Sequence, residues 1–490
     1  MKKIIIIGAG VAGLSAGILA QKSGFDTEIH EMHTLPGGLC TSWKRGSYLF
    51  DGCIRYVYGS GEGRFFHSVM KEIGADSLHF IHHSESICVE TSTGEAVTFY
   101  CDLDRLKEHL LKISPEDGKP VKTLIKLAKS LSRASMPMTG MKSPADLIRT
   151  IRGGLSFMRV MLKYRKASLG SFAASLKSVA LREAFAKYYG YTDLEELPLL
   201  VLIIDMAQHH AGNAGWPLGG SIGFARRLEE NYLSLGGAVH YRSKVEKILV
   251  KDGRAVGIRL EGGQERMADY ILSAGDVHAA LYEWLDGKYT TSAWEEAFRN
   301  DKPITPVIQV SLGIDADISH IPHNIALYLE KPIEVAGIRY DYLSFRHYWY
   351  DRAMAPEGKS ALVAVLETDY ETWEQLCANK QRYAEEKQSA AKQVVERIER
   401  RFPEIAGKVE VVDVATPMTY VRYTGNYQGS VQGWQTYMGH ILPYSGELPG
   451  LKGFMMIGQW VQRGGGLPGG AVSAFNAVKK ICKEYGVKMG

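Results

Sequence analysis

The chain has 490 residues, which is too long for one ordinary domain and suggests about three folded units. Its composition, 45% apolar and 23% charged, is typical of a soluble globular protein and excludes a disordered chain. The net charge of +4 does not favour nucleic acid as a partner, and six cysteines without a CxxC pair predict neither a zinc site nor a disulfide framework. We therefore expect a reducing, cytoplasmic setting and no metal.

The amino-terminal segment combines a short apolar run with closely spaced glycines. Residues Ile4–Ile7 predict a buried parallel strand, and the motif Gly8-x-Gly10-x-x-Gly13 follows directly and opens a predicted helix. A second predicted strand ends in Glu31, 18 residues after Gly13. The two lysines and the apolar run are also found in secretory signal peptides, but the glycine spacing and the terminal acid favour a dinucleotide-binding βαβ unit.

Each part of this motif has a mechanical role. Gly8 permits a tight turn, Gly10 removes the side chain that would block a pyrophosphate, and Gly13 lets the helix and the strand touch. The free N–H groups and the positive dipole end of the helix can then bind the phosphates. Glu31 can accept hydrogen bonds from both ribose hydroxyls, which favours an unphosphorylated ribose.

A second glycine pair, Gly37–Gly38, allows another backbone segment to close on the cofactor, which suits a ligand larger than NAD. The stretch GGLCTSWKRGSYLFDGCIRYVYG resembles the flavoproteins of the amine-oxidase superfamily and, within it, the phytoene-desaturase and retinol-saturase branch. This resemblance implies that FAD is the cofactor. An arginine that is common after the glycine pair in amine oxidases is Leu39 here, so its role does not transfer.

Further segments resemble the same branch. The block 216–263 resembles its middle motif, in which Ser221 can cap a helix and Val245 meets the adenine through its backbone. The block 453–481 resembles its carboxy-terminal FAD motif, in which a strand ends beside the ribityl-pyrophosphate. The resemblance also implies that the amides of Gly470 and its neighbour open a helix that points at the flavin O2.

Together, these motifs predict cofactor-binding residues at both ends and in the middle of the chain. They are Gly8, Gly10, Val11, Ala12, Gly13, Glu31, Met32, Gly37, Gly38, Leu39, Val245, Gly458, Gln459, Gly469, Gly470 and Ala471.

The predicted fold class is α/β, with a discontinuous Rossmann-like FAD-binding domain of the GR2 type, an inserted α+β substrate domain and a helical cap. The expected extents are 1–85, 216–280 and 415–490 for the FAD-binding domain, 86–118 and 281–414 for the substrate-binding sheet domain, and 119–215 for the basic cap. Alternation and periodicity predict a hairpin, two strands and a helix in the sheet domain, at 86–100, 304–312, 361–366 and 383–402.

The segment 119–180 carries 13 Lys or Arg residues against one acidic residue. Within it, 147–166 predicts a basic amphipathic helix with the apolar stripe Ile148, Ile151, Leu155, Met158 and Leu162. Such a helix can lie on an anionic membrane surface, or its stripe can pack in the core of the cap, and both interpretations stay open. The apolar run 197–204 is far shorter than the roughly 20 residues that span a bilayer and predicts a buried helix or strand. His209 and His210 follow it, as core or loop histidines or as a substrate-site acid.

The resemblance implies chemistry on carbon–carbon bonds. Members of this branch desaturate, saturate or isomerise long isoprenoid polyenes, which implies a hydrophobic polyene or isoprenoid lipid as substrate and hydride exchange with flavin N5. We expect a wide apolar tunnel with walls among the aromatic residues near the flavin motifs, Tyr56, Tyr58, Tyr423, Tyr427, Trp434 and Trp460. The candidate catalytic residues are Arg55, whose charge could stabilise reduced flavin, Tyr423 and His440.

Two other functions stay open on the sequence alone. An amine or porphyrinogen oxidase could share the fold, although the sequence assigns no aromatic pair to the cage that amine oxidation requires. A non-redox isomerase could keep FAD as a structural group, because one fold supports several chemistries.

Overall fold

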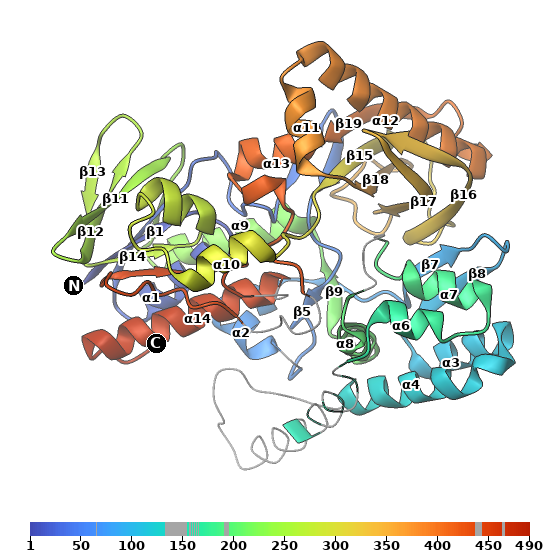
Figure 1. The fold of residues 1–490 in the computed structure, drawn as a ribbon, viewed down its shortest axis with the longest axis horizontal. Coiled ribbons are helices and arrows are strands. Elements are labelled where there is room, and N and C mark those ends of the chain that lie inside the picture. Colours follow the sequence, from blue (N-terminus) through green and yellow to red (C-terminus); the bar gives the residue numbers. More distant parts are fainter. Residues whose placement is uncertain are drawn as a thin grey trace.

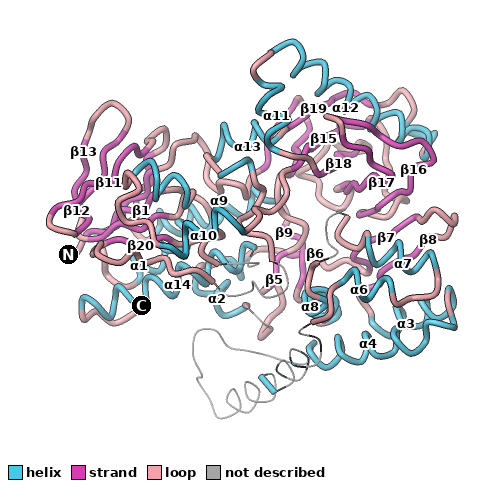
Figure 2. Tube along the Cα trace, viewed as in Figure 1, coloured by secondary structure: helices cyan, strands magenta, loops and turns pink. Residues whose placement is uncertain are grey.

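The computed structural model describes residues 1–64, 66–132, 154, 155, 158, 160, 162, 164, 166–190, 196–436, 443–462 and 466–490. Figure 1 shows three parts of the molecule: a lobe that holds both chain ends, a large sheet with helices on its outer side, and a group of short helices below that sheet. The tube in Figure 2 shows that strands dominate the second part and helices the third.

A parallel sheet forms the centre of the lobe that holds both chain ends. Its described strands have the order β10 (Ala238–His240), β2 (Asp26–His30), β1 (Lys3–Ile7), β14 (Tyr270–Ser273) and β20 (Phe454–Met456). Alternate residues of β1 enter two separate hydrophobic clusters, Ile4 and Ile6 in one and Ile5 and Ile7 in the other. A strand buried on both faces is what the unbroken isoleucine run predicts, and the Rossmann-like fold class is confirmed.

One face of this sheet is covered by helices and the other by a small antiparallel sheet. The helices α1 (Val11–Lys22), α9 (Gly220–Ser234) and α14 (Gly466–Tyr485) pack together on the first face. On the second face lie the strands β11 (Val245–Lys251), β12 (Arg254–Leu260) and β13 (Glu265–Met267), of which β11 and β12 form the predicted hairpin. The helices η3 (Ala279–Trp284) and α10 (Ser292–Asn300) pack in this same cluster, although the expected boundary at residue 281 assigned most of this stretch to the substrate domain.

The second part is a mixed sheet assembled from two distant stretches of the chain. Its described strands have the order β19 (Val409–Ala415), β15 (Val307–Ile314), β18 (Ser360–Glu367), β17 (Ile338–His347), β16 (Asn324–Val335), β7 (Glu85–Glu90) and β8 (Ala96–Tyr100). Every pair is antiparallel except β16 with β7. The helices α11 (Tyr370–Cys377) and α12 (Lys380–Arg401) cover it (Figure 1). The predicted hairpin, strands and helix of this part are therefore confirmed.

The third part consists of short helices that share one hydrophobic cluster. They are α3 (Leu103–Ile113), α4 (Gly118–Ser132), α6 (Leu169–Ala174), α7 (Val179–Ala186) and α8 (Leu199–His210). The apolar run at 197–204 is thus largely helical. Most of the predicted helix at 147–166 lies outside the described residues. Among the helices that the structure describes, none is both long enough and apolar enough to cross a bilayer.

Short elements join the three parts. They are the strand pair β3 (Ser42–Arg45) and β4 (Tyr48–Asp51), the strands β5 (Val57–Tyr58), β6 (Phe80–Ile81) and β9 (Ala214–Pro217), the helices α2 (His67–Glu72) and α13 (Pro417–Thr424), and the single turns η1 (Ala75–Ser77), η2 (Pro115–Asp117), η4 (Pro403–Ile405) and η5 (Tyr427–Gly429). In this region the expected cap of α9 by Ser221 is wrong. The N-cap is Gly219, and Ser221 instead directs its hydroxyl to Asp51.

Candidate functional site

The glycine motif forms a tight turn between β1 and α1. Gly8 has φ +98°, a conformation that favours glycine, and its N–H donates to the carbonyl oxygen of His30 at 2.8 Å. A Cβ at Gly13 would lie 2.0 Å from the carbonyl oxygen of Gly8. The helix and the turn therefore touch at a distance that leaves no room for a side chain.

Neither the backbone conformation nor the surrounding protein atoms require a glycine at position 10. Its backbone is extended, with φ −69° and ψ 176°, and a Cβ there would meet only the carbonyl oxygen of Gly37, at 3.8 Å, among the described atoms. Helix α1 starts at Val11 without a side-chain cap or an acidic residue in its first turn. Space beside Gly10 and uncapped N–H groups together form a site that fits a phosphate.

Glu31 lies at the end of β2, in the position of a ribose-binding acid. Its side chain is buried, and its two carboxylate oxygens accept hydrogen bonds from the N–H groups of Ala9 at 2.7 Å and His33 at 2.8 Å. Burial raises the pKa of Glu31, and these two donors act in the opposite direction. Each oxygen keeps a second lone pair that can accept a ribose hydroxyl.

The segment after Glu31 returns to the first turn. The N–H of Gly37 donates to the carbonyl oxygen of Ala9 at 2.8 Å, and Gly10 pairs with Gly37 in a parallel bridge. A Cβ at Gly38 would lie 3.5 Å from the Cα of Gly10. Two backbone segments therefore lie side by side with no side chains between them.

The carboxy-terminal motif closes the other end of this surface. A Cβ at Gly458 would lie 3.5 Å from the Cβ of Ala12, and one at Gly470 would lie 3.7 Å from it. Ser473 joins the two glycines, because its hydroxyl accepts from the N–H of Gly458 and donates to the carbonyl oxygen of Gly470. Gly469 and Ala471 flank Gly470 in this same helix, and Gln459 donates to Asn426.

The start of this last helix differs from expectation. Helix α14 begins at Gly466, so Gly470 and Ala471 lie in its second turn and do not open it. Pro468 lies in the first turn of this helix, where its missing N–H leaves no helical hydrogen bond unmade.

The remaining predicted cofactor residues lie around Glu31 or behind the glycine pair. The carbonyl oxygen of Glu31 accepts from the N–H of Ser243 at 2.8 Å, which brings the start of β11, with the buried Val245, next to the acid. Met32 is partly exposed beside Gly425. Leu39 instead packs against a small hydrophobic cluster that contains Tyr420.

We call the continuous surface formed by Gly8–Gly13, Glu31, Gly37–Gly38, Gly458 and Gly470 the cradle. Its glycines, its acid and its uncapped helix end fit the diphosphate and ribose of FAD, and Gly10 provides the sharpest test of that fit because no protein contact explains it. The residues present therefore match the group that this fold binds.

A buried aspartate connects the cradle to a second region of the molecule. Asp51, at the end of β4, accepts hydrogen bonds from the N–H groups of Cys53, Ile54 and Ser221 and from the hydroxyls of Ser42 and Ser221. Cys40, which donates to the carbonyl oxygen of Gly37, also contacts Ser221. The loop after Asp51 is therefore fixed to the cradle, and it continues directly into Arg55 and Tyr56.

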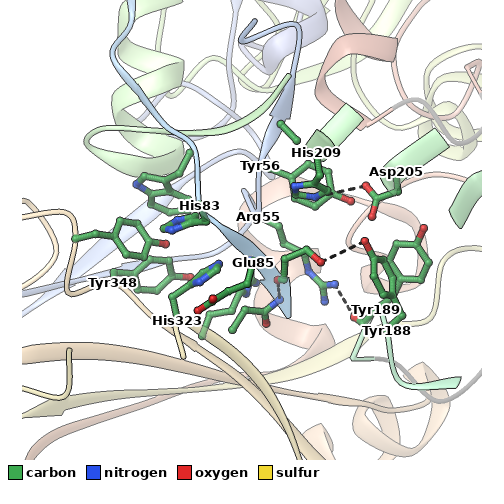
Figure 3. Close-up of a pocket in the computed structure, with 16 residues that line it drawn as sticks. Arg55, Tyr56, His83, Glu85, Tyr188, Tyr189, Asp205, His209, His323 and Tyr348 are labelled. Carbon is green, nitrogen blue, oxygen red and sulfur yellow. Dashed lines mark hydrogen bonds and ion pairs between the residues drawn. The ribbon is translucent and has the colours of Figure 1, made fainter. Parts of the chain in front are cut away.

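Arg55 and Tyr56 line a pocket where the three parts of the molecule meet (Figure 3). Its walls come from the β4–β5 loop, from β7, from α8, from β9 and from the segments beside β17. We call it the polar pocket, because its lining consists mainly of the side chains Arg55, Tyr56, His83, Glu85, Ser86, Tyr188, Tyr189, Asp205, His209, Trp216, His323, Asn324, Arg346, Tyr348 and Tyr350.

The polar pocket is not the wide apolar tunnel that the sequence predicts. Its cavity volume is about 30 Å³, enough for one or two water-sized groups. An apolar groove lies elsewhere, between α4, α6 and α8, with a volume of about 370 Å³ and a lining that includes Leu124, Leu127, Phe172 and Leu199. The sequence could not separate these two spaces, because aromatic and apolar residues near a motif do not reveal which elements meet.

Hydrogen bonds and burial set the charge of the polar pocket. The Tyr58 hydroxyl donates to Asp205 Oδ1, and His209 Nε2 lies 3.7 Å from the same oxygen. Burial lowers the pKa of His83 to about 4 and holds the pKa values of His209 and His323 below their ordinary range. The three histidines are therefore neutral at pH 7.

Two of the three predicted catalytic residues, Arg55 and Tyr423, lie within the described residues, and they lie at different places. Arg55 lines the polar pocket, and its guanidinium donates to the carbonyl oxygen of Tyr189 at 2.5 Å. Tyr423 is 46% exposed and packs edge-on against His33, beside the ribose end of the cradle. His440 lies outside the described residues. Tyr423, near the carboxyl end of α13, is not among the residues that line the polar pocket with Arg55.

The predicted aromatic walls divide in the same way. Tyr56 lines the polar pocket and Tyr58 bonds to Asp205, whereas Tyr427, Trp434 and Trp460 pack with one another in the cluster of the parallel sheet. Sequence reasoning missed Asp205, His83, His323 and Tyr348 as pocket residues. Only His209 carried a signal, as a histidine directly after an apolar run.

A Rossmann-like sheet with a glycine-lined cradle and a polar pocket beside it defines the class of this protein, an FAD-dependent oxidoreductase. The chain belongs to the flavin containing amine oxidoreductase family, whose model matches residues 11–482.

Curated relatives span most of the chain at low identity. The prolycopene isomerase of Arabidopsis thaliana is 21% identical, over 87% of this chain and 73% of its own length. The all-trans-retinol 13,14-reductase of Danio rerio is 22% identical, over 88% of this chain and 77% of its own. The zeta-carotene-forming phytoene desaturase of Myxococcus xanthus is 23% identical, over 96% of this chain and 92% of its own length.

Solved structures share the fold. An oxidoreductase from Methanosarcina mazei superposes with a TM-score of 0.65 at 18% identity and covers 97% of this chain and 100% of its own. Cyclohexylamine oxidase from Brevibacterium oxydans superposes with a TM-score of 0.59 at 14% identity, with 99% of each chain covered.

Proposed function

We propose that this protein uses FAD to change carbon–carbon bonds of a polyene or isoprenoid lipid, by desaturation, saturation or isomerisation. The observation that carries this proposal is the chain of contacts from the cradle through Asp51 to Arg55 and the polar pocket, which joins the cofactor site to a second, buried polar site. The proposal also draws on the relatives named for prolycopene, retinol and phytoene, which match along most of the chain.

Bound FAD supplies the ability to accept or donate a hydride. The protein's own residues supply position, proton transfer and exclusion of water. In this proposal Arg55, held by the carbonyl oxygen of Tyr189, provides positive charge beside the cofactor. The Tyr58 hydroxyl donates to Asp205 Oδ1, and in this proposal that pair supplies the proton for the substrate.

The apolar groove supports a hydrophobic substrate. Its volume of about 370 Å³ lies within the range of small-molecule sites, and its walls include aliphatic and aromatic side chains of the helical part. The sequence also offered an isomerase without net redox change, and the prolycopene isomerases among the relatives favour keeping that alternative.

We also propose that the stripe of the predicted basic helix lies on an anionic membrane surface. Of that stripe, Leu155, Met158 and Leu162 are within the described residues, and they are 53%, 56% and 65% exposed. Large apolar side chains at such exposure support contact with an acyl boundary over packing in the cap. A membrane is also where a polyene lipid dissolves.

A spectroscopic experiment tests the redox proposal. Purified protein with FAD is reduced under anaerobic conditions and offered polyenes that differ in saturation, while the flavin absorption band and the products are followed. Reoxidation of the flavin with a matched loss of a double bond supports hydride exchange. A polyene whose double-bond geometry changes while the flavin band shows no net change supports the isomerase alternative. An unaltered polyene contradicts both the hydride-exchange proposal and the isomerase alternative.

A vesicle experiment tests the membrane proposal. The triple variant Leu155→Gln, Met158→Gln, Leu162→Gln is compared with the native chain for sedimentation with anionic vesicles at low and high salt. We expect the variant to lose most of its vesicle binding. The matched control replaces three residues of similar exposure elsewhere, Leu233, Met267 and Val412. Equal loss in both triple variants, or no loss in the first, contradicts the proposal.

A further inference from the structure

Four buried polar atoms without hydrogen-bond partners surround the polar pocket. Among the described residues, ten buried side-chain nitrogen or oxygen atoms lack a partner, and four of these line this pocket: His83 Nε2, Tyr189 OH, His209 Nε2 and Tyr348 OH. Buried polar groups in native proteins are normally paired, since an unpaired one is costly. A cluster of four around one cavity therefore indicates that a hydrogen-bonding group enters it.

The unpartnered atoms converge from different elements. Tyr348, which is 1% exposed, lies just after β17 with its ring 5.0 Å from that of Trp216. His83 stacks on His323 at 3.7 Å, and His209 lies on α8 with its ring 4.7 Å from Tyr56. Figure 3 shows the group of His83, His323 and Tyr348 on one side of the cavity and Asp205 with His209 on the other. Aromatic packing fixes these rings, so their polar atoms are positioned before a ligand arrives.

The size and charge of the cavity restrict that ligand. A volume of about 30 Å³ admits a hydroxyl or carbonyl group but not a hydrocarbon ring. The lining includes two guanidinium groups, of Arg55 and Arg346, and two carboxyl groups, of Glu85 and Asp205. This balance favours an uncharged oxygen over a carboxylate or an ammonium group.

Helix α8 contributes residues to both the polar pocket and the apolar groove. Leu199, at its start, lines the groove, whereas Asp205 and His209 line the pocket. At 1.5 Å per residue, Leu199 and Asp205 are about 9 Å apart along the helix axis. The two sites are therefore close enough along this helix for one extended ligand to place its polar end at the pocket and its apolar chain toward the groove.

We propose that the substrate carries an uncharged oxygen at one end, a polyene alcohol or carbonyl compound rather than a pure hydrocarbon, and that the polar pocket binds this oxygen through Tyr348, Tyr189, His83 and His209. The inference rests on the proposed function, because it specifies the substrate class of that site. It adds that recognition occurs at the oxygen and that the hydrocarbon chain lies toward α8.

Matched ligand pairs test this inference. Retinol and two longer polyene alcohols are each paired with the hydrocarbon in which hydrogen replaces the hydroxyl group, and binding to the FAD-loaded protein is measured by difference absorbance. For the pair of best-fitting length, we expect the alcohol to bind at least about tenfold more tightly, because the hydrocarbon leaves the buried polar atoms unpaired. The corresponding carboxylate should bind more weakly than the alcohol.

One substitution separates recognition from folding. Tyr348→Phe removes an oxygen that has no partner in the free protein, so we expect the thermal midpoint to stay or rise while the alcohol loses about tenfold in affinity and the hydrocarbon loses none. Tyr189→Phe should act in the same way and serves if the first variant does not fold. The control is Tyr340→Phe on β17, whose hydroxyl already donates to Glu367, so it should lower the midpoint without changing the preference.

The outcomes distinguish the two proposals. Equal affinity for alcohol and hydrocarbon, or an unchanged preference in both tyrosine variants, overturns this inference and leaves the polyene proposal in place. Binding of neither member of any pair overturns both proposals. Tighter binding of the carboxylate overturns the assignment of an uncharged oxygen.

Discussion

The cradle and the polar pocket are built from different materials. The surface of the cradle consists mainly of backbone atoms, because its key positions are glycines. Its one acid, Glu31, already accepts hydrogen bonds from two backbone N–H groups. The surface of the pocket consists mainly of side chains. Fifteen polar or aromatic residues and one alanine line it, and four of their buried polar atoms have no hydrogen-bond partner. The cradle therefore offers mainly backbone groups to its ligand, whereas the pocket offers side-chain groups.

This difference explains what each region recognises. A backbone cradle can hold one ligand shape in many relatives, because it does not depend on side-chain identity. A side-chain pocket changes with every substitution, so it can specify the substrate of one protein. Function should therefore respond differently when the two regions are altered.

The largest expected effect comes from two glycines of the cradle. Gly13→Ala places a Cβ 2.0 Å from the carbonyl oxygen of Gly8, so we expect loss of the folded FAD-binding lobe. Gly10→Ala meets no protein atom closer than 3.8 Å, so we expect a folded protein with a normal thermal midpoint that has lost roughly tenfold or more in FAD affinity. Circular dichroism and FAD titration measure the two effects.

Gly24→Ala is the control for backbone strain. Gly24 has φ +84°, and a Cβ at this residue would have no described atom within 4 Å, so alanine should cost only about 1 kcal/mol and leave FAD binding unchanged. If Gly10→Ala binds FAD as well as the native chain does, the cradle does not approach the cofactor at this residue.

The next effect tests the link between the two regions. Asp51→Asn removes charge and acceptor capacity from a buried group that serves five donors, so we expect a loss of about 2 to 4 kcal/mol in unfolding free energy. FAD affinity and ligand binding should fall together, because both the cradle and the Arg55 loop are fixed to this residue. Urea denaturation gives the first value and titrations the second.

Asp413→Asn provides the comparison on the surface. Asp413 accepts from Trp43 and Arg45 at the edge of the sheet, so its substitution should cost about 1 kcal/mol or less. If Asp51→Asn lowers the unfolding free energy no more than Asp413→Asn does, the cradle and the polar pocket are not coupled through Asp51.

The last effect concerns the pH dependence of stability and the pocket residue His83. The pKa of His83 is lowered by burial to about 4, below its value in the unfolded chain, so the unfolded state binds the proton more tightly. Stability should therefore be full above about pH 6.5 and fall, by up to about 3 kcal/mol, as the pH drops toward 4. The variant His83→Asn should flatten this part of the curve. An unchanged pH profile in that variant would contradict a buried, neutral His83.

Local sequence predicted the cradle well because its physics is local. The isoleucine run, the glycine spacing and the acid after the second strand lie within 31 residues, and the structure brings them together through one turn and one strand pair. The start of α14 was misplaced because the glycines there were interpreted as a helix opening, whereas a proline at the third position lets the helix begin at Gly466.

The polar pocket could not be predicted from the sequence. Its residues come from positions 55 to 350, and no spacing pattern relates Arg55, Asp205 and Tyr348. They meet because β7 pairs with β16 and α8 packs beneath them, which are contacts between distant segments. The sequence proposed Tyr423 together with Arg55 as catalytic, but Tyr423 lies on α13 against His33 and does not line the pocket.

The order of strands in the parallel sheet has a consequence for synthesis of the protein. Strands β1 and β2 leave the ribosome first, but β20 and helix α14, which supply Gly458 and Gly470, are made last. Nearly the whole polypeptide must therefore emerge before FAD can be enclosed. We therefore expect FAD to be enclosed late in maturation, and we expect a chain that stops before residue 454 to lose the flavin.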